Sequence, residues 1–273
     1  MTDATADPTA DATATADATA DKARELLRLH REPELLTVVN VWDAISARVV
    51  ADVPGTRALA TASHSIAATL GYEDGENIPV QEMLDMVGRI VRATDLPVTA
   101  DLEGGYGDAA GTVRRAIDIG VVGANLEDQL KPLPEAVRQV EQVMAVAEQA
   151  GVEFVLNART DVFLRAGDRD RGEVLAEATE RGRAFLDAGA PVVFVPGFLS
   201  EEEVAHLCDA FGPQRLTVIG LPGHPPLARL QELGVARISF GPVSQNVALT
   251  ALQKMVEDVH RGGTAPEDTR RLN

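Results

Sequence analysis

The sequence contains almost no cysteine, the residue that forms disulfides and many metal sites. Its 273 residues contain a single cysteine, Cys208, which excludes an internal disulfide and a metal site built from several cysteines. Cys208 lies in an amphipathic helical stretch, so we expect a buried apolar residue rather than a nucleophile. Aromatic residues make up only 4% of the chain, and no apolar run approaches the roughly 20 residues of a membrane span.

Positive charge is also scarce. The chain has 25 Lys and Arg against 42 Asp and Glu, a formal net charge of −17. Because phosphate groups are repelled by an acidic surface, this balance argues against a nucleic-acid or anionic-membrane partner. The first residues lack the basic start and apolar core of a signal peptide, which favours a cytoplasmic location.

Residues 1–21 consist almost entirely of Ala, Thr and Asp and contain no basic residue. Such a tract has too little apolar surface to offset the entropy that is lost when a chain becomes ordered. The composition therefore predicts a disordered tail, followed by one folded domain over residues 22–262 and a C-terminal tail over residues 263–273.

From Lys22 onwards, short β-rich runs alternate with stretches of helical period. The runs are 36–42, 57–61, 97–103, 123–127, 154–159, 192–195, 216–221 and 237–240, and the clearest helical stretches are 80–93, 133–150, 172–188 and 201–211. Eight strands that alternate with helices over about 220 residues are typical of a (β/α)8 TIM barrel, an α/β fold. An open doubly wound sheet usually has fewer strands and a glycine-rich phosphate-binding turn after the first. No such turn follows Trp42, so the barrel is favoured, with a short helix over 22–31 before it.

Charged residues gather at the ends of the predicted strands, where the active site of a barrel lies. Asp101 and Glu103 stand two apart at the end of one strand, so their carboxylates point to the same side. With Asp74 and Glu127 they form a set of hard oxygen ligands, which suits Mg²⁺ or Mn²⁺. The alternative is a set of helix caps and surface ion pairs.

Two further acids and one arginine at the strand ends have both a functional and a structural interpretation. Asp108 and Asp161 precede helical or loop segments, where a carboxylate can cap a helix. Arg159 ends the strand that follows Glu127 in the chain. Its guanidinium could hold a substrate carboxylate or phosphate with two hydrogen bonds, or it could form a structural bridge to Glu127.

Five histidines occur, and His64, at the end of the second predicted strand, is the candidate for chemistry. His30 and His260 fall in predicted helices and are expected at the surface. His206 lies within another predicted helix and should face solvent or the core. His224 follows the seventh strand, where a functional and a structural role are both open.

Five ordered motifs resemble those of the isocitrate lyase/phosphoenolpyruvate mutase superfamily, over about residues 34–250. They are Asn-Val-Trp-Asp-Ala-Ile-Ser-Ala-Arg (40–48), Ala-Ser-His (62–64) followed by Leu-Gly-Tyr-Glu-Asp (70–74), Asp-Leu-Glu-Gly-Gly-Tyr-Gly (101–107), Asn-Leu-Glu-Asp (125–128) and Asn-Ala-Arg-Thr-Asp (157–161). The resemblance implies a magnesium-dependent barrel enzyme that acts on a small 2-oxo or hydroxy acid, usually through an enolate.

The same resemblance implies roles for individual residues. The implied metal ligands are Asp101 directly and, through water, Asp74, Glu103 and Glu127. The implied substrate contacts are Trp42, Ser63, His64, Arg159 and Gly197. Of these, Ser63 and His64 would bind an oxyanion through their backbone amides, and Arg159 would hold the substrate's carboxylate or phosphonyl end. Arg159, His64 and Glu127 are the candidates for a catalytic role.

The chain departs from the family pattern in the loop after the fourth strand. Isocitrate and methylisocitrate lyases carry Lys-Lys/Arg-Cys-Gly-His there, and its cysteine serves as the acid. Here the segment 127–134 reads Glu-Asp-Gln-Leu-Lys-Pro-Leu-Pro, without cysteine, and Lys131 is its candidate for closing over a substrate. The longer loop of the mutases is also absent, and their Asp-x-Asp and Gly-Leu appear here as Asp101-x-Glu103 and Ser63-His64.

These features favour an enzyme that cleaves a C–C bond of a small 2-oxo or 2-hydroxy (di)carboxylic acid, as a lyase or an oxaloacetate-type hydrolase. Two alternatives stay open: P–C bond chemistry of the mutase or phosphonopyruvate hydrolase kind, and a non-catalytic homologue that binds a metal and an acid. Family members commonly assemble as dimers of dimers that exchange a C-terminal helix. With a final predicted helix at 244–261, a homo-oligomer, dimer or tetramer, is expected here.

Overall fold

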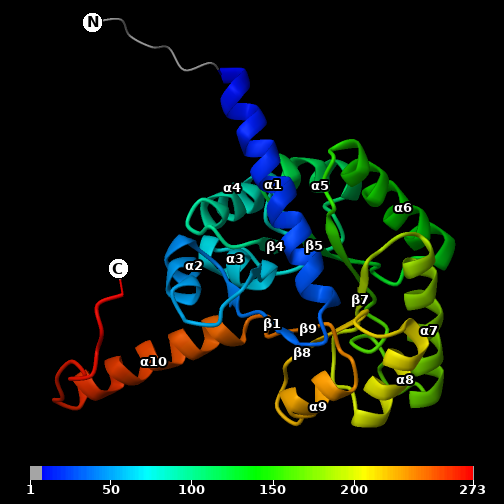
Figure 1. The fold of residues 1–273 in the computed structure, drawn as a ribbon. Helices are drawn as coiled ribbons and strands as arrows, with labels where there is room; N and C mark the ends of the chain where they lie inside the picture. Colours follow the sequence, from blue (N-terminus) through cyan, green and yellow to red (C-terminus); the bar gives the residue numbers. More distant parts are fainter. Residues whose placement is uncertain (1–7, 273) are drawn as a thin grey trace, which may run out of the picture.

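In the computed structural model, which describes residues 8–272, nine parallel strands form one curled sheet surrounded by helices (Figure 1). The strands are β1 (Leu36–Thr37), β2 (Asn40–Val41), β3 (Leu59–Thr61), β4 (Val98–Asp101), β5 (Gly123–Glu127), β6 (Val155–Arg159), β7 (Val192–Phe194), β8 (Leu216–Ile219) and β9 (Arg237–Ser239). The helices are α1 (Pro8–Arg31), α2 (Ala44–Ala51), α3 (Ser63–Leu70), α4 (Val80–Val91), α5 (Ala109–Asp118), α6 (Leu133–Gln149), α7 (Arg171–Asp187), α8 (Glu201–Phe211), α9 (Leu227–Glu232) and α10 (Val243–His260).

The sheet closes into a barrel through its first strand, which is split into two pieces. β1 pairs with β9 and β2 pairs with β3, so the short gap between β1 and β2 joins the two edges of the sheet. Inside that gap the Val38 amide still donates to the Ile238 carbonyl at 3.0 Å. The predicted (β/α)8 barrel is confirmed, and the alternative of an open doubly wound sheet is wrong.

The outer helices cover the sheet because each has one apolar face and a defined start. In α4 the buried residues Met83, Leu84, Val87 and Ile90 recur at the three- and four-residue spacing of a helix face. Ser200 caps the start of α8: its hydroxyl accepts from the Glu203 amide while the Glu203 carboxylate accepts from the Ser200 amide. This capping box satisfies two backbone donors that the helix itself leaves unpaired.

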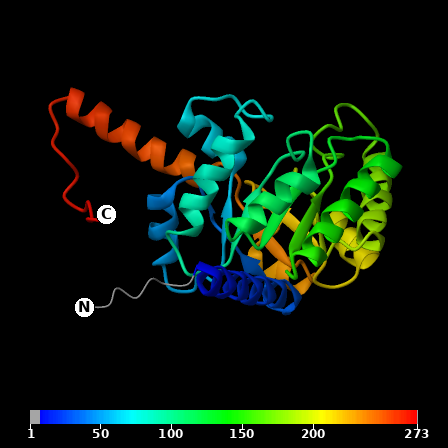
Figure 2. The same cartoon turned by 90° about the horizontal axis from the view of Figure 1, so that it is seen from above.

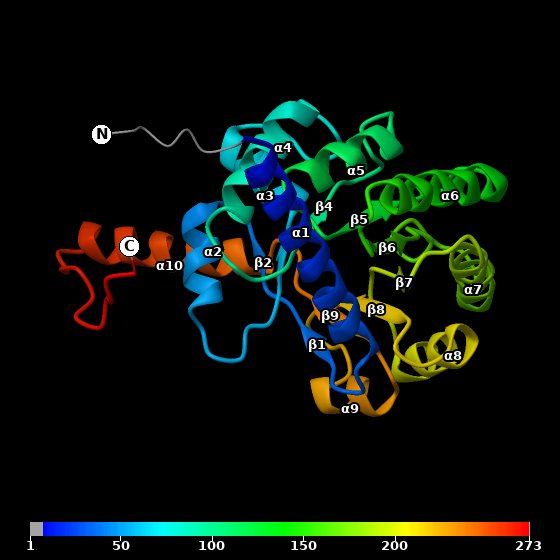
Figure 3. The ribbon, with the colours of Figure 1, turned by 45° about the horizontal axis from the view of Figure 1, so that its top comes forward.

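Helix α1 lies across the N-terminal ends of the strands and closes that end of the barrel (Figures 2 and 3). Its buried residues Ala23, Leu26, Leu27 and His30 share one face, at the spacing of successive turns. Because this face packs on the barrel, the expectation that His30 lies at the surface is wrong: the side chain is 0% exposed. Its Nδ1 donates to the Leu26 carbonyl at 2.8 Å.

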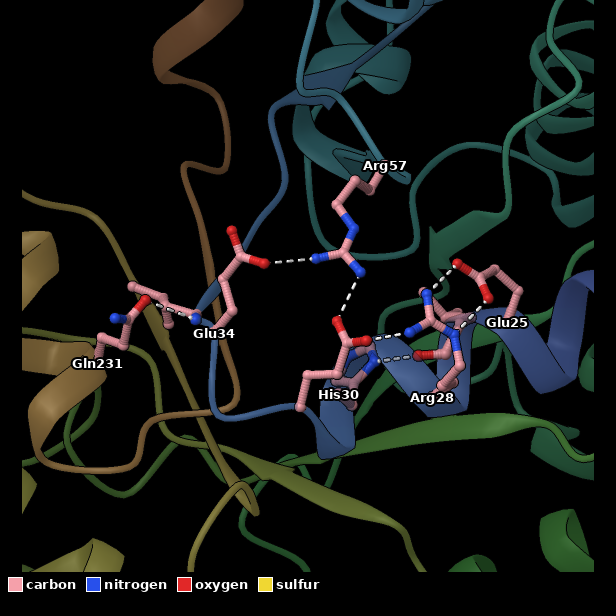
Figure 4. Close-up of polar contacts among 9 residues, drawn as sticks. Glu25, Arg28, His30, Glu34, Arg57 and Gln231 are labelled. Atoms are coloured by element: carbon pink, nitrogen blue, oxygen red, sulfur yellow. Dashed lines mark hydrogen bonds and ion pairs between the residues drawn. The ribbon is translucent and has the colours of Figure 1, made fainter.

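Ion pairs fasten the C-terminal end of α1 to the barrel (Figure 4). Arg57, in the segment that leads into β3, donates to Glu32 at 2.5 Å and to Glu34 at 2.9 Å. Arg28 of α1 pairs with Glu25 in the same helix at 2.7 Å and also with Glu32, the residue that follows the helix. The shared Glu32 therefore links the end of α1 to Arg57, 25 residues later in the chain.

Helix α1 also begins earlier than predicted. The tail predicted as disordered, residues 1–21, is helical from Pro8 onwards, and residues 1–7 lie outside the described residues. Alanine has the highest helix propensity and proline suits a first helical position, which favours a helical extension here. Thr19 is buried one turn before Ala23, so the packed face also reaches into the segment predicted to be disordered.

Helix α10 projects away from the barrel (Figures 1 and 2). Only Gln245, near its start, is buried among the described residues of this helix, and it donates to the Ser65 carbonyl at 3.1 Å. Residues 263–272, predicted as a tail, contain no helix or strand. None of the helices in the described part of the chain is long and apolar enough to cross a membrane.

Candidate active site

Three predicted site residues meet at the C-terminal ends of neighbouring strands. β4, β5 and β6 lie side by side, with Asp101 opposite Asn125 and Glu127 opposite Arg159 in register. The chain therefore brings a carboxylate pair and a guanidinium to one sector of the barrel mouth. This is the end of a TIM barrel at which catalytic residues are found.

Asp101 keeps one carboxylate oxygen for a further ligand. Its Oδ2 accepts from the Ser63 hydroxyl at 2.7 Å and from the Ser63 amide at 3.3 Å. Its own amide donates to Thr61 Oγ1 at 2.9 Å. Oδ1 is buried and has no hydrogen-bond partner among the described residues. A buried anionic oxygen without a partner is costly, which points to a cation at this position.

Glu103 is tied to two residues that the sequence analysis did not single out for the site. Its side chain accepts from the Tyr106 hydroxyl at 2.8 Å and from the Glu76 amide at 2.5 Å. The Glu76 carboxylate accepts in turn from the Tyr106 amide at 2.5 Å. Burial raises the pKa of Glu103, and its hydrogen bonds to Tyr106 and Glu76 partly oppose the rise. In the sequence, Tyr106 could have been found from the Gly-Gly-Tyr-Gly motif, and Glu76 from its position two residues after Asp74.

Glu127 and Arg159 form an ion pair, so the structural bridge that was the alternative role for Arg159 is present in the fold. Arg159 Nη2 lies 3.0 Å from Glu127 Oε2, and Arg159 Nε lies 2.6 Å from Asp161 Oδ1. Burial raises the pKa of Glu127 to about 7; Arg159 opposes the rise, whereas Asp161 and Asp101 add to it. Burial by itself would lower the pKa of Arg159. The carboxylates of Asp101, Asp161 and Glu127 raise this pKa by more, so the net shift is upward.

The other strand-end acids have structural partners. Asp108 caps α5 by accepting from the Gly111 amide at 2.9 Å, which confirms the helix-cap interpretation. Asp128 pairs with buried Arg181 at 3.1 Å and accepts from the Asp161 amide at 3.3 Å. Lys131, the candidate for closing over a substrate, donates to Gln139 Oε1 at 3.0 Å.

The carboxylates fit a hydrated magnesium ion rather than a preformed cage. Among the described residues, no three His, Cys, Asp or Glu side chains could hold a metal ion by themselves. Mg²⁺ is usually bound by one or two carboxylates and keeps several waters. Asp101 Oδ1 supplies one free buried oxygen. Asp101 and exposed Asp74 are both near enough to Glu103 to raise its pKa, so the acids share one electrostatic site.

The predicted substrate contacts lie around the same end of the barrel. Trp42 is partly buried after β2, and His64 is exposed in the first turn of α3. Ser63 is 5% exposed and engaged with Asp101. Gly197 is buried after β7 with φ of 117°, and a Cβ there would lie 3.2 Å from Phe163 Cβ. Both the backbone conformation and the space therefore require glycine at this position.

Arg237 was missed although it lies inside the barrel. It is 1% exposed on β9, and its Nη2 donates to Asn125 Oδ1 at 3.2 Å. Asn125 also accepts from Asn157, which accepts from Thr217, so a polar network fills part of the barrel core. Burial lowers the pKa of Arg237 to about 10, against the charge of Asp101. The signal was an arginine at the first position of the last predicted strand, 237–240, which forms β9.

Cys208 is buried, as predicted, and burial raises the pKa of its thiol to about 12. It lies on α8, a helix on the outside of the barrel. A thiol with such a pKa is protonated at neutral pH and is a poor nucleophile. The cysteine acid of the lyases therefore has no counterpart in Cys208.

Comparison with known proteins identifies the family. The family model for phosphoenolpyruvate phosphomutase matches residues 26–260. The chain belongs to the phosphoenolpyruvate mutase/isocitrate lyase superfamily. A curated relative, the 2,3-dimethylmalate lyase of Eubacterium barkeri, is 30% identical over 248 residues, which are 85% of this chain and 82% of the relative.

Solved structures of similar proteins share the fold of this chain. A protein from Burkholderia cenocepacia J2315 whose proposed activity is that of a phosphonomutase has a TM-score of 0.83 and 41% identity, covering 90% of this chain and all of that one. Oxaloacetate acetylhydrolase bound to the inhibitor 3,3-difluorooxalacetate has a TM-score of 0.80 and 26% identity, with 90% and 89% covered. The similar proteins thus include an oxaloacetate acetylhydrolase and a protein of proposed phosphonomutase activity.

Proposed function

We propose that this protein is a Mg²⁺- or Mn²⁺-dependent enzyme that cleaves a C–C bond of a small 2-oxo or 2-hydroxy (di)carboxylic acid through an enolate, as a lyase or an oxaloacetate-type hydrolase. The observation that carries the proposal is the free, buried Oδ1 of Asp101 at the barrel mouth, in one electrostatic site with Glu127 and Arg159. Such a site can bind a cation and an organic anion together.

Asp101 would hold the metal directly, and Asp74, Glu103 and Glu127 would hold its waters. The metal, when bound, would stabilise negative charge that develops on the oxygens of the acid. Ser63 would keep Asp101 oriented through its hydroxyl, which donates to Oδ2 and leaves Oδ1 to face the ion.

Arg159 would hold a carboxylate of the substrate. Its Nε and Nη2 already bond Asp161 and Glu127, which fixes the plane of the guanidinium before a substrate arrives. Such preorganisation lowers the entropy cost of binding. The amides of Ser63 and His64 would meet an oxyanion, for which the Ser63 amide would give up its 3.3 Å hydrogen bond to Asp101 Oδ2. Trp42 and Gly197 would line the pocket. His64 and Glu127 are the proposed proton carriers.

P–C bond chemistry is the second candidate, favoured by the 41% identity to the Burkholderia protein of proposed phosphonomutase activity. Arg159 suits a phosphonate as well as a carboxylate, because both present two oxygens to a guanidinium. A binder without catalytic activity would keep the metal site and release no product.

Product analysis separates these candidates. The full chain with Mg²⁺ would be incubated with oxaloacetate, alkylmalates, alkylcitrates and phosphonopyruvate, followed by assays for 2-oxo acids, oxalate and phosphate. We expect C–C cleavage products, and a loss of roughly 100-fold or more in kcat/KM for Arg159→Lys because a lysine cannot form two parallel hydrogen bonds. Asp108→Ala, which removes a helix cap, is the control. Release of phosphate from phosphonopyruvate, or its conversion into phosphoenolpyruvate followed by phosphorus NMR, would favour the second candidate, and binding without any product would favour the third.

We also propose that the protein is a homo-oligomer, a dimer or tetramer, in which α10 contacts another copy. The support is its exposed apolar side chains, Val247, Leu249, Leu252, Val256 and Val259, between 40% and 65% exposed. A projecting helix with such residues exposes more apolar surface than a monomer usually leaves in water. The cytoplasmic location, and the absence of nucleic-acid and membrane partners, stay predictions from the sequence.

A further inference from the structure

Loop 71–79, between α3 and α4, lies at the end of the barrel opposite α1 (Figure 2). Glu76 joins this loop to the loop after β4. Its amide donates to Glu103 Oε2 at 2.5 Å, and its own Oε1 accepts from the Tyr106 amide at 2.5 Å. Glu76 Oε2 also accepts from Gln129 Nε2, in the loop after β5, at 3.4 Å. One residue therefore connects three loops at the mouth of the barrel.

The backbone of these three loops is held in an unfavourable conformation. Among the described residues other than glycine, six have a φ in the left-handed region. Five of the six belong to these loops, with φ between 49° and 61°: Glu76, Glu103, Tyr106, Gln129 and Leu130. A residue with a Cβ keeps such a φ only where its surroundings hold it, and such residues gather at ligand sites. The hydrogen bonds of Glu76 are part of what holds them here.

These contacts fix the carboxylate of Glu103. Its Oε1 accepts from the Tyr106 hydroxyl at 2.8 Å and its Oε2 accepts from the Glu76 amide, so each oxygen has one hydrogen bond. Glu103 is 4% exposed, and its carboxylate cannot turn without leaving a buried polar group unpaired. Each oxygen keeps a second lone pair, which can accept from a water on a metal ion.

The same contacts fix the place of Asp74, two residues before Glu76. The side-chain amide of Asn77 donates to the Asp74 carbonyl at 2.7 Å, which closes a tight turn around Glu76. The charge of Asp74 contributes to the raised pKa of Glu103, so the two acids are close to each other. If Glu76 released the loop after β4, Asp74 would leave with it.

We propose that Glu76 is a positioning residue that sets the metal affinity of the site, because it orients Glu103 and docks the loop that carries Asp74, without contacting the ion itself. This inference rests on the proposed function, which assigns Asp74 and Glu103 to the waters of the metal. Replacing a residue that orients the groups around a metal typically lowers the affinity by roughly 10- to 100-fold. Metal binding and loop docking strengthen each other by the same factor, because coupling between two equilibria is reciprocal.

The test measures metal binding and loop exchange without turnover. Binding of Mn²⁺ to the full chain would be followed by the paramagnetic resonance signal of the free ion, and hydrogen exchange of residues 71–79 by mass spectrometry. We expect Glu76→Ala to weaken Mn²⁺ binding by at least about tenfold. Mn²⁺ should slow exchange of the loop in the parent protein much more than in this variant.

Two further variants separate geometry from charge. Glu76→Gln loses the charge but keeps an oxygen that accepts from the Tyr106 amide, so it should bind Mn²⁺ nearly as tightly as the parent. Glu76→Asp keeps the charge and tolerates a positive φ, but its carboxylate is one methylene short of that amide, so it should resemble Glu76→Ala. Glu73→Ala is the matched control: Glu73 is exposed in the same loop, and among the described residues its side chain has no hydrogen bond.

Each outcome decides one point. Unchanged Mn²⁺ affinity in Glu76→Ala and Glu76→Asp overturns the proposal. Tight binding by Glu76→Asp with weak binding by Glu76→Gln also overturns it, because the charge of Glu76 would then act on the ion. If the variants behave as expected but no acid is cleaved in the product assay, the proposed function fails while the role of Glu76 stands. If acids are cleaved while Glu76→Ala binds Mn²⁺ like the parent, the reverse holds, and a parent protein that binds no Mn²⁺ overturns both.

Discussion

At the residue scale, the ionisable groups of the barrel are controlled by burial and by their immediate partners. Glu127, between Arg159 and a set of other acids, has a pKa of about 7, so its proton can be exchanged near neutral pH. His30, at the other end of the barrel, is fully buried and stays neutral. Both shifts arise because a buried charge loses its hydration.

His30 provides a prediction about stability and pH. Burial, with a contribution from the charge of Arg237, lowers the pKa of His30 from 6.5 to about 3. Between these values the unfolded chain binds a proton that the folded chain does not. The contribution of neutral His30 is therefore fully present above about pH 6.5 and declines by up to about 1.4 kcal/mol for each pH unit below it. Urea unfolding at pH 7, 6 and 5 should show a shallower decline for His30→Gln. His206→Gln, at an exposed position, is the control, and parallel pH curves for parent and His30→Gln would contradict the assignment.

At the element scale, the two terminal helices behave in opposite ways. α1 packs an apolar face on the barrel, and Arg57 bonds the residues at its C-terminal end. α10 has a similar share of apolar residues, but few of them meet the rest of the chain. The difference lies in what each helix finds next to it, because amphipathicity alone does not determine which surface a helix covers.

The exposed face of α10 gives a prediction about assembly. Val247→Asp or Leu252→Asp should shift the protein towards a smaller species, because an aspartate buried in an apolar interface loses its hydration without a partner. Light scattering coupled to gel filtration measures the molar mass directly. Gln253→Asp, on an exposed polar position of the same helix, should leave the mass unchanged. A parent protein that is monomeric at micromolar concentration would contradict the proposed oligomer.

At the scale of the whole molecule, a chain with a net charge of −17 concentrates several acids at one end of a barrel. Burial, and to a smaller extent the charge of Asp101, raises the pKa of both Glu103 and Glu127 there. A divalent cation relieves the repulsion between these acids in the folded state only. Binding to the folded state alone stabilises a protein through mass action.

Metal binding should therefore be visible as thermal stabilisation. Mg²⁺ at 100 times its Kd stabilises the folded state by about 2.7 kcal/mol, which corresponds to a rise in Tm of about 5 °C or more. Asp101→Asn should lose most of this rise because it removes the proposed direct ligand. Asp108→Asn, which changes a helix cap instead, should keep it. Differential scanning calorimetry with and without Mg²⁺ gives the result, and equal shifts in parent and Asp101→Asn would refute the role of Asp101.

Much of the architecture was predictable from local pattern. Strand runs and helical periods identified the barrel, and Asp101, Glu127 and Arg159 were recognised because charges at the ends of apolar strands are not needed for folding. Glu76 and Tyr106 were not predicted because their hydrogen bonds to Glu103 form within and between loops, where no periodic pattern shows which residues meet. Glu76 lies 27 residues from Glu103 in the chain, and Tyr106 lies 3 residues from it. His30 was misplaced because the period of a helix does not say which face meets the core.

The sequence by itself determined the elements, their order, the acidic charge and the motifs that define the superfamily, because these depend on neighbours in the chain. Tertiary structure alone decided that Arg159 pairs with Glu127, that Asp101 keeps one free oxygen and that Arg237 lies inside the barrel. These relations depend on strand register and on closure of the barrel, which bring together side chains that lie far apart in the chain and set how much water reaches each of them.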